Sequence, residues 1–327
     1  MKPADSQSGL TKPNEVNSQL YAGLDTRYST TQHVIDTPPS LSHEPDCKFR
    51  PQLQLPVDKD RKGEGGLRTK GIYKSSLPNK PLITVITVVF NGASTIEDAI
   101  RSVINQTYNN IEYLIIDGGS NDGTVEILKL YEHAIDYWVS EKDGGIYDAM
   151  NKGIALSSGA YIGMLNADDL FAGQEVVRDY ADGFCAMNVD AIFSSLNIVD
   201  KGNLKKILRK YRINRLSAWL LRIGVMPPHP TFYCKRASLQ SAGPYNTSYH
   251  IAADFEMLVR LCIKQKISWK FLDKVSVIMR SEGISNSGFL ARLKLNGEII
   301  RACRENGLYT NALLLALKLP IRLFELI

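Results

Sequence analysis

The sequence predicts an α/β fold in which a mostly parallel, Rossmann-related sheet is flanked by helices. Several short segments rich in Val, Ile, Leu and Tyr have the length and composition of buried strands. They alternate with segments whose apolar residues recur at helical spacing. Polar turns of Gly, Asn, Asp and Ser separate them, so the chain reads as repeated βα units. Such units connect parallel strands through right-handed crossovers.

Three regions are expected along the chain. Residues 1–79 show neither helical nor alternating periodicity, and nine of the 14 prolines lie at or before Pro81, so a disordered or loosely ordered N-terminal extension is expected there. Residues 80–288 carry the βα pattern and are expected to form the α/β domain. Residues 289–327 are expected to form C-terminal helices.

The first two βα units follow directly from the pattern. The first strand is expected at 82–90, with a helix after Asn91 that places its apolar residues on one face. The second strand is expected at 111–116. A turn at 117–123 then leads into a helix that Thr124 can cap.

A third strand is expected at 135–139, followed by a loop and short helix over 141–153. The next apolar strand, 161–165, ends at a run of carboxamide and carboxylate side chains: Asn166, Asp168 and Asp169. In open α/β sheets, ligands bind outside the carboxyl ends of the strands. Hard oxygen ligands suit Mg²⁺ or Mn²⁺ carrying substrate phosphates. An Asx-type turn that only caps backbone amides is the alternative.

Three familiar ligand-binding motifs are missing. The first strand is followed by Phe-Asn-Gly-Ala-Ser-Thr at 90–95, whereas a dinucleotide fingerprint needs GxGxxG there. The chain has no Walker A sequence. The turn after the second strand suggests a calcium loop, but Gly119 and Leu128 stand where an EF-hand needs Asp or Asn and Glu.

The composition of the chain limits which kinds of molecule it is expected to bind. The net charge of +5 is too small to indicate a nucleic acid, but it is compatible with membrane surfaces and phosphorylated ligands. The five cysteines form no CxxC pair, which argues against a disulfide framework or a zinc site. No secretory signal and no apolar run of about 18 residues is present. A cytoplasmic location is expected.

Four blocks of sequence, taken in order, carry a resemblance to a known family. They are residues 84–91, residues 115–124, residues 145–153 continuing through 165–169, and residues 252–260. Their order and spacing resemble the GT-A glycosyltransferases of family 2, especially bacterial enzymes that build O-antigen, capsule or colanic-acid-like polysaccharides. The resemblance covers about 81–287 and leaves the N-terminal extension outside.

The resemblance implies roles for individual residues. Phe90, Asn91 and Asp117 would hold the base and ribose of a nucleotide-sugar donor. Asp168, with Asp169 beside it, falls on the family's DxD-type site and would ligate Mn²⁺ or Mg²⁺ at the two phosphates. Three residues of the third block are further candidates for donor binding: Asp148, Asn151 and Lys152. Lys152 reads equally well as a solvated surface charge, and for Asp148 a hydrogen bond within its own loop is the alternative.

Two positions depart from the family pattern. Gly118 stands where the family often has a second Asp that reads uracil, so base recognition is expected to shift to Asp117 or to backbone groups. Asn166 stands at the DxD position that is often Asp, which leaves Asp168 and Asp169 as the expected ligands. A weaker metal site is one consequence.

The fourth block implies the base that takes the proton of the acceptor hydroxyl. Asp254 occupies the matching position, with Glu256 as the second candidate. On local pattern alone, Asp254 could instead cap its helix. His229 lies between the metal and base blocks, where the family has acceptor-binding elements, and a buried structural histidine is the alternative.

Two segments bear on the acceptor. Residues 201–222 interleave Lys and Arg with apolar residues, and residues 312–327 are apolar but interrupted by charge. Either could rest on anionic headgroups or a lipid-linked acceptor at the cytoplasmic membrane face. For the C-terminal segment, docking on the catalytic core is the alternative. Residues 281–288 could form a loop that closes on the donor, with an ordinary connection as the equal alternative.

The expected function is therefore transfer of a hexosyl or N-acetylhexosaminyl group, with inversion, from a nucleotide-sugar, expected to be a UDP-sugar, to a hydroxyl of a lipid-linked glycan. Two alternatives stay open. Because Gly118 and Asn166 both replace family carboxylates, the chain could be an inactive nucleotide-sugar-binding subunit or a scaffold of a glycan-assembly complex. A nucleotidyltransferase would share the sheet and metal use, but its glycine-rich basic loop after the first strand is missing.

Overall fold

The computed structural model describes residues 24–41, 47–281 and 288–318. Most of the loop expected at 281–288, namely 282–287, lies outside these ranges. So do residues 1–23 and 42–46 of the expected N-terminal extension and residues 319–327 at the other end.

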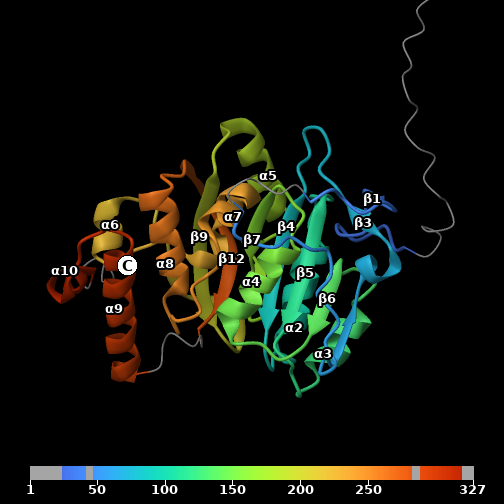
Figure 1. The fold of residues 1–327 in the computed structure, drawn as a ribbon, viewed down its shortest axis with the longest axis horizontal. Coiled ribbons are helices and arrows are strands. Elements are labelled where there is room, and N and C mark those ends of the chain that lie inside the picture. The colour runs from blue at the N-terminus through green and yellow to red at the C-terminus, as the bar shows by residue number, and fades with distance from the viewer. Residues whose placement is uncertain (1–23, 42–46, 282–287, 319–327) are drawn as a thin grey trace, which may run out of the picture.

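A large mixed sheet runs through the centre of the molecule (Figure 1). Its strand order is β2-β6-β5-β4-β7-β11-β9-β12-β8, with β10 paired to β9. The strands are β2 (Gly63–Gly65), β4 (Ile83–Val89), β5 (Ile111–Asp117), β6 (Tyr137–Ser140), β7 (Tyr161–Met164), β8 (Asp169–Phe171), β9 (Ala191–Asp200), β10 (Asn203–Tyr211), β11 (Tyr233–Lys235) and β12 (Trp269–Arg280). A separate pair joins β1 (Val34–Ile35) to β3 (Tyr73–Lys74).

The strand directions confirm a mostly parallel sheet. β6, β5, β4 and β7 pair in parallel, and β12 is parallel to β9. β2, β8, β10 and β11 are antiparallel to their neighbours. All seven residues of β4 and of β5 are buried, as expected for parallel strands covered on both faces.

Helices cover both faces of the sheet. The α-helices are α2 (Ile96–Ile104), α3 (Thr124–Leu130), α4 (Ile146–Leu156), α5 (Val176–Met187), α6 (Ala218–Arg222), α7 (Arg236–Ala242), α8 (Ala253–Val259), α9 (Gly288–Glu305) and α10 (Ala312–Ala316). Shorter turns are η1 (Leu67–Lys70), η2 (His229–Thr231) and the π-helical η3 (Arg260–Lys264). One apolar cluster packs α2, α3 and α5 on the sheet, and another packs α4, α7, α8 and α9.

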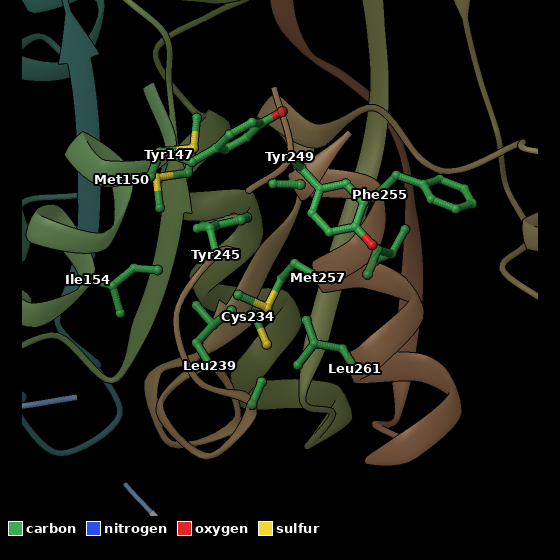
Figure 2. Packing of buried hydrophobic residues seen from close by; sticks show 14 of the residues in the cluster. Tyr147, Met150, Ile154, Cys234, Leu239, Tyr245, Tyr249, Phe255, Met257 and Leu261 are labelled. Atoms are coloured by element: carbon green, nitrogen blue, oxygen red, sulfur yellow. The ribbon is translucent and has the colours of Figure 1, made fainter. Parts of the chain in front are cut away.

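The second cluster contains residues of the parallel strands β4 to β7 and of β9 and β11 on the other side of β7. Figure 2 shows three of its members: Tyr147 of α4, Met257 of α8, and Tyr245, which lies between α7 and α8. The hydroxyl of Tyr147 donates to the backbone oxygen of Ile251, 2.6 Å away, just before α8. Residues of the third and fourth sequence blocks are therefore brought together by packing between α4 and α8.

The described part of the expected N-terminal extension is packed rather than loosely draped. β2 adds a strand to the edge of the sheet beside β6. Arg68 pairs with Glu112 of β5 and Lys74 pairs with Asp136, and all four side chains are buried. Composition could not foresee these contacts, because each partner lies more than 40 residues away in the sequence. The domain boundary expected at 79/80 stays a prediction.

We expect Lys74→Met to lower the free energy of unfolding by about 3–5 kcal/mol, because it leaves Asp136 buried without its charge partner. The Lys74 ammonium lies 2.6 Å from Asp136 Oδ2 and is fully buried. Urea unfolding would measure the loss. The double variant Lys74→Met/Asp136→Asn removes both charges and should recover part of it. A loss below about 1 kcal/mol in the single variant would show that this segment is only loosely attached.

Candidate functional site

The carboxyl ends of four parallel strands meet at one edge of the sheet. The register pairs Val89 with Asp117 and Asp117 with Ser140, and Ile86 of β4 with Met164 of β7. The turn after β4, the turn after β5, the loop after β6 and the residues that follow β7 therefore all open at this edge. The structure thus brings the first three sequence blocks together.

The turns after β4 and β5 are joined by hydrogen bonds. Ser120 Oγ accepts from the backbone nitrogen of Asn91 at 2.7 Å, and Asn91 Oδ1 accepts from the nitrogen of Asn121 at 3.0 Å. Asn91 has φ of 51°, a left-handed conformation that Asn tolerates well. The ring of Phe90 is 67% exposed. These hydrogen bonds hold the two turns together, next to the exposed ring of Phe90.

Asp117 lies beneath this turn and is completely buried. Its carboxylate accepts hydrogen bonds from the backbone of Gly119 and Ser120 and from the hydroxyls of Ser120 and Ser140. A carboxylate held by so many donors is already satisfied. The geometry supports a role in shaping the turn rather than the direct contact with base and ribose that the sequence predicted.

The three candidates of α4 have different surroundings. Asn151 exchanges two hydrogen bonds with the backbone of Tyr245, at 2.7 and 2.9 Å, so it ties α4 to the chain before α8. Lys152 pairs with Glu141 at 2.8 Å. The carboxylate of Asp148 accepts from the nitrogen of Gly144 at 3.0 Å and stays 36% exposed. Contact of these side chains with a nucleotide donor stays a prediction.

The residues after β7 form an oxygen-rich segment. Asp168 is half-buried, while Asp169 is completely buried at the start of β8. Asn166 Nδ2 donates to Asp169 Oδ2 at 3.0 Å. Burial and then the neighbouring Asp168 carboxylate raise the pKa of Asp169 well above its usual value. Arg280 Nη1 donates to the backbone oxygen of Asp168 at 2.7 Å.

This segment fits a divalent cation by its unused oxygens. In the described part of the chain, Asn166 Oδ1 and Asp169 Oδ1 are buried and have no hydrogen-bond partner. Such acceptors are rare in folded proteins and suit an ion or water. No group of three or more His, Cys, Asp or Glu side chains among the described residues could hold a metal by itself. The arrangement therefore suits an ion shared with donor phosphates, with Asp168 as its accessible ligand.

Asp254 lies in the first turn of α8, beside a small and mainly apolar pocket. Met226, Phe232, Met257 and Leu258 are among the residues that line it. Burial raises the pKa of Asp254, and the nearby His229 opposes that shift. A half-buried carboxylate with a raised pKa has the properties of a general base.

Glu298 holds the chain that leads into α8. Glu298 of α9 accepts hydrogen bonds from the backbone nitrogens of His250, Ile251 and Ala252, at 2.9 to 3.0 Å. Two of these nitrogens lie just before α8, and that of Ala252 is at its N-cap. Asp254 itself accepts from the backbone nitrogen of Phe255 in the first turn of α8, at 2.8 Å. The first-turn role that the local pattern allowed is therefore present, and the role of Asp254 as base stays a prediction.

His229 also lines this pocket. Its Nε2 lies 2.9 Å from the hydroxyl of Tyr245, and burial lowers the pKa of the imidazole. A neutral imidazole can exchange a proton with a hydroxyl group, and one ring nitrogen is used here by Tyr245. The predicted acceptor contact and the structural alternative are therefore both compatible with its position.

Glu256, the second candidate base, is placed differently. It is 5% exposed, and Arg260 Nη2 donates to its carboxylate at 2.7 Å. Asn306 Nδ2 donates to its other oxygen at 3.0 Å. The carboxylate is engaged on both oxygens, which supports a structural role that joins α8 to η3 and α9.

Sequence reasoning did not single out three residues near these positions: Asp143, Arg280 and Tyr245. Asp143 precedes a pair of glycines after a strand, a pattern that signals a tight turn and could have drawn attention to it. Arg280 lies at the end of β12 and contacts the backbone of Asp168. Tyr245 lies on the chain before α8 and contacts His229. No local signal identifies them.

Comparisons with known proteins show the family and the fold of this chain. Residues 84–240 match the family model described as Glycosyl transferase family 2. An uncharacterized glycosyltransferase of Mycobacterium tuberculosis is 30% identical over 197 residues, covering 57% of this chain and 71% of the relative. A PGL/p-HBAD biosynthesis glycosyltransferase of Mycobacterium bovis is 27% identical over 241 residues, covering 66% and 85%.

Solved structures share the fold. TarS of S. aureus, residues 1–349, matches with a TM-score of 0.53 and 16% identity, covering 70% of this chain and 66% of that one. The mannosyltransferase PcManGT from Pyrobaculum calidifontis, in complex with GDP-Man and Mn²⁺, matches with a TM-score of 0.51 and 17% identity, covering 71% and 66%. The fold is the GT-A fold, and the chain belongs to glycosyltransferase family 2.

Proposed function

We propose that this glycosyltransferase moves a hexosyl or N-acetylhexosaminyl group, with inversion, from a nucleotide-sugar to a hydroxyl of a lipid-linked glycan. The observation that carries the proposal is that two candidate carboxylates lie at two different places in the fold. Asp168 lies after β7 at the carboxyl edge of the sheet, and Asp254 lies beside a pocket at the start of α8. Asp168 is placed to bind a metal ion at the diphosphate of a donor, and Asp254 is placed to take a proton from an acceptor hydroxyl.

The proposed reaction is a single displacement. As the acceptor oxygen bonds to the anomeric carbon, Asp254 takes the hydroxyl proton and the bond to the β-phosphate oxygen breaks. A bound Mn²⁺ or Mg²⁺ would stabilise the negative charge on the departing nucleoside diphosphate. Asp168 would hold that ion, and Arg280, fixed on the Asp168 backbone, would keep the segment in place.

Several findings on related proteins support a nucleotide-sugar donor. A TarS structure contains UDP, and the PcManGT structure contains GDP-Man and Mn²⁺. Another relative is named for PGL/p-HBAD biosynthesis, which supports a biosynthetic role. We propose a UDP-sugar as the donor, in keeping with the UDP complex of TarS.

The first test is thermal stabilisation of the purified protein by UDP- and GDP-sugars, with Mn²⁺, with Mg²⁺ and with chelator. Stabilisation by a UDP-sugar only in the presence of metal, together with transfer to a lipid-linked acceptor, is the expected result. Binding without transfer or hydrolysis would favour the inactive binding subunit, which the replacements at Gly118 and Asn166 keep open as a second candidate. No binding by a folded protein would overturn both.

We expect the acidic limb of the pH profile for transfer to lie above the usual aspartate range. Burial raises the pKa of Asp254, and the base acts only when ionised, so activity is present above that raised pKa and falls as the pH drops through it. The ratio kcat/KM measured from about pH 4 to 8 would show the limb. Full activity down to about pH 4 would contradict the assignment of Asp254 as base.

We also propose that the chain rests on the cytoplasmic face of the membrane through its C-terminal apolar face, defined as Trp219, Tyr309, Leu313 and Leu317. These side chains are 46 to 82% exposed. Arg222 Nε donates to the backbone oxygen of Tyr309 at 2.8 Å, which joins α6 to the chain before α10. Figure 1 shows both helices at the same end of the molecule. Exposed Trp and Leu beside Arg suit the interface of an anionic bilayer.

This proposal predicts binding to vesicles that contain anionic lipid, with a blue shift of Trp219 fluorescence. Among the described residues, no helix is long and apolar enough to cross a bilayer. Because attraction between Arg222 and anionic headgroups is screened by ions, high salt should weaken the binding. Leu313→Ser should weaken co-sedimentation several-fold. Leu130→Ser, at an exposed apolar residue of α3 far from this face, is the matched control. Equal loss in both variants, or no binding at low salt, would contradict the proposal.

A further inference from the structure

Gly118 is covered by a carboxylate from another part of the chain. A Cβ atom built on Gly118 would lie 2.8 Å from Oδ2 of Asp143 and 3.3 Å from its Cγ. The Asp143 carboxylate therefore occupies the space that a side chain at position 118 would fill. Gly118 directly follows β5, and its nitrogen donates to the backbone oxygen of Val89 at 2.9 Å, so it lies alongside Phe90.

The loop that carries Asp143 is held in place on both sides. The nitrogen of Glu141 donates to the backbone oxygen of Asp117 at 3.0 Å. The Glu141 carboxylate pairs with Arg61 and Lys152, at 2.9 and 2.8 Å. After Asp143, the nitrogen of Gly145 donates to its Oδ1 at 2.8 Å. Asp143 is therefore positioned by contacts that do not involve Oδ2.

Asp143 Oδ2 is available to a ligand. No donor among the described residues makes a hydrogen bond to this oxygen, whereas Asp117 below it is fully satisfied. Phe90 and Gly118 directly follow the last paired residues of β4 and β5, Val89 and Asp117, and the ring of Phe90 is exposed. An exposed aromatic residue and a carboxylate are therefore found at the same part of the sheet edge. Bases stack on aromatic rings, and carboxylates accept hydrogen bonds from N–H and O–H groups.

We propose that Asp143 accepts a hydrogen bond from the nucleoside of the donor, either from a base N–H or from a ribose hydroxyl. Asp143 thereby supplies from the loop after β6 the carboxylate that Gly118 does not provide at the end of β5. This inference rests on the proposed use of a nucleotide-sugar. It goes further by naming a residue that determines nucleotide affinity.

The test is calorimetric binding of UDP in the presence of Mn²⁺. Asp143→Asn retains an oxygen for Gly145 but places an amide N–H₂ where Oδ2 was, so we expect UDP affinity to fall at least tenfold. Asp182→Asn, on the exposed side of α5, is the control and should leave affinity unchanged. Thermal unfolding would show that each variant is folded.

A relocated carboxylate makes the test specific. Gly118 has no positive φ, so Asp fits its backbone, but Gly118→Asp alone would collide with Asp143. Gly118→Asp/Asp143→Ala places a carboxylate at position 118, in the space that the Asp143 carboxylate fills in the natural chain. We expect the UDP affinity of this variant to lie within about threefold of that of the natural chain. Gly118→Asn/Asp143→Ala, which lacks the charge, should stay weak.

Modified nucleotides identify the donor group. If Asp143 contacts the base, Asp143→Asn should not weaken binding of 3-methyl-UDP any further. If it contacts the ribose, the same holds for 2′,3′-dideoxy-UDP. Unchanged UDP affinity in Asp143→Asn would overturn the inference, as would failure of the relocated carboxylate to restore it. A folded natural chain that binds neither UDP nor GDP would instead overturn the proposed function itself.

Discussion

Asp254→Asn is expected to lower the rate of sugar transfer roughly 100- to 10,000-fold, the usual contribution of a general base. The amide has the same shape and can still accept the hydrogen bond that Phe255 donates to Asp254 Oδ1 at 2.8 Å, so the helix should be undisturbed. The amide cannot take a proton from the acceptor hydroxyl. Single-turnover transfer, with donor binding followed separately, would measure the effect.

Glu256→Gln is the matched control for this prediction. Its carboxylate is paired with Arg260 and bound by Asn306, so the change should lower stability more than turnover. Asp254→Asn should therefore be folded but slow in transfer, whereas Glu256→Gln should be less stable but active. Normal turnover in Asp254→Asn would remove Asp254 from the base position, and collapse of turnover in a folded Glu256→Gln would transfer the role to Glu256.

Asp168→Asn is expected to abolish the part of donor affinity that depends on Mn²⁺ or Mg²⁺. The half-buried Asp168 carboxylate is the accessible charge of the oxygen-rich segment, while Asp169 is buried with a raised pKa and bonded to Asn166. Without the Asp168 charge, the remaining oxygens hold a divalent ion poorly. Titration of UDP with and without Mn²⁺ should show a metal-dependent gain in the natural chain and little gain in the variant.

The outcome of this titration also distinguishes the two carboxylates. Asp169→Asn should retain some metal-dependent affinity if Asp168 is the accessible ligand, although loss of a buried carboxylate can lower stability. Because both variants can be compared at equal fractions folded, the metal dependence is read separately from unfolding. An unchanged response to Mn²⁺ in Asp168→Asn would count against its role as ligand.

The core elements of the α/β half were predicted from the sequence because their signals are local. The strands that became β4, β5, β6 and β7 are short apolar runs ended by polar turns, and α2 carries its buried residues at helical spacing. Parallel pairing then follows from the βα order. The convergence of Asn91, Asp117 and Asp168 at one edge was predictable for the same reason.

The partners of individual side chains were decided only by the tertiary structure. Asp117 and Glu256 have the residue type and position of functional carboxylates, yet bonds from Ser140 and Asn306, distant in sequence, engage them structurally. Conversely, Glu298 of α9 holds the chain that leads into the helix of Asp254, whose carboxylate lies beside the pocket.

The fold class, the order of the strands along the first half of the domain and the edge at which the candidate carboxylates gather all follow from the amino-acid sequence. Those properties depend on apolar periodicity and turn residues within short windows. Which carboxylates lack hydrogen-bond donors, and that Asp143 covers Gly118, can be seen only in the folded chain. Burial and hydrogen bonding depend on residues brought together from distant parts of the chain, and a linear pattern does not contain those distances.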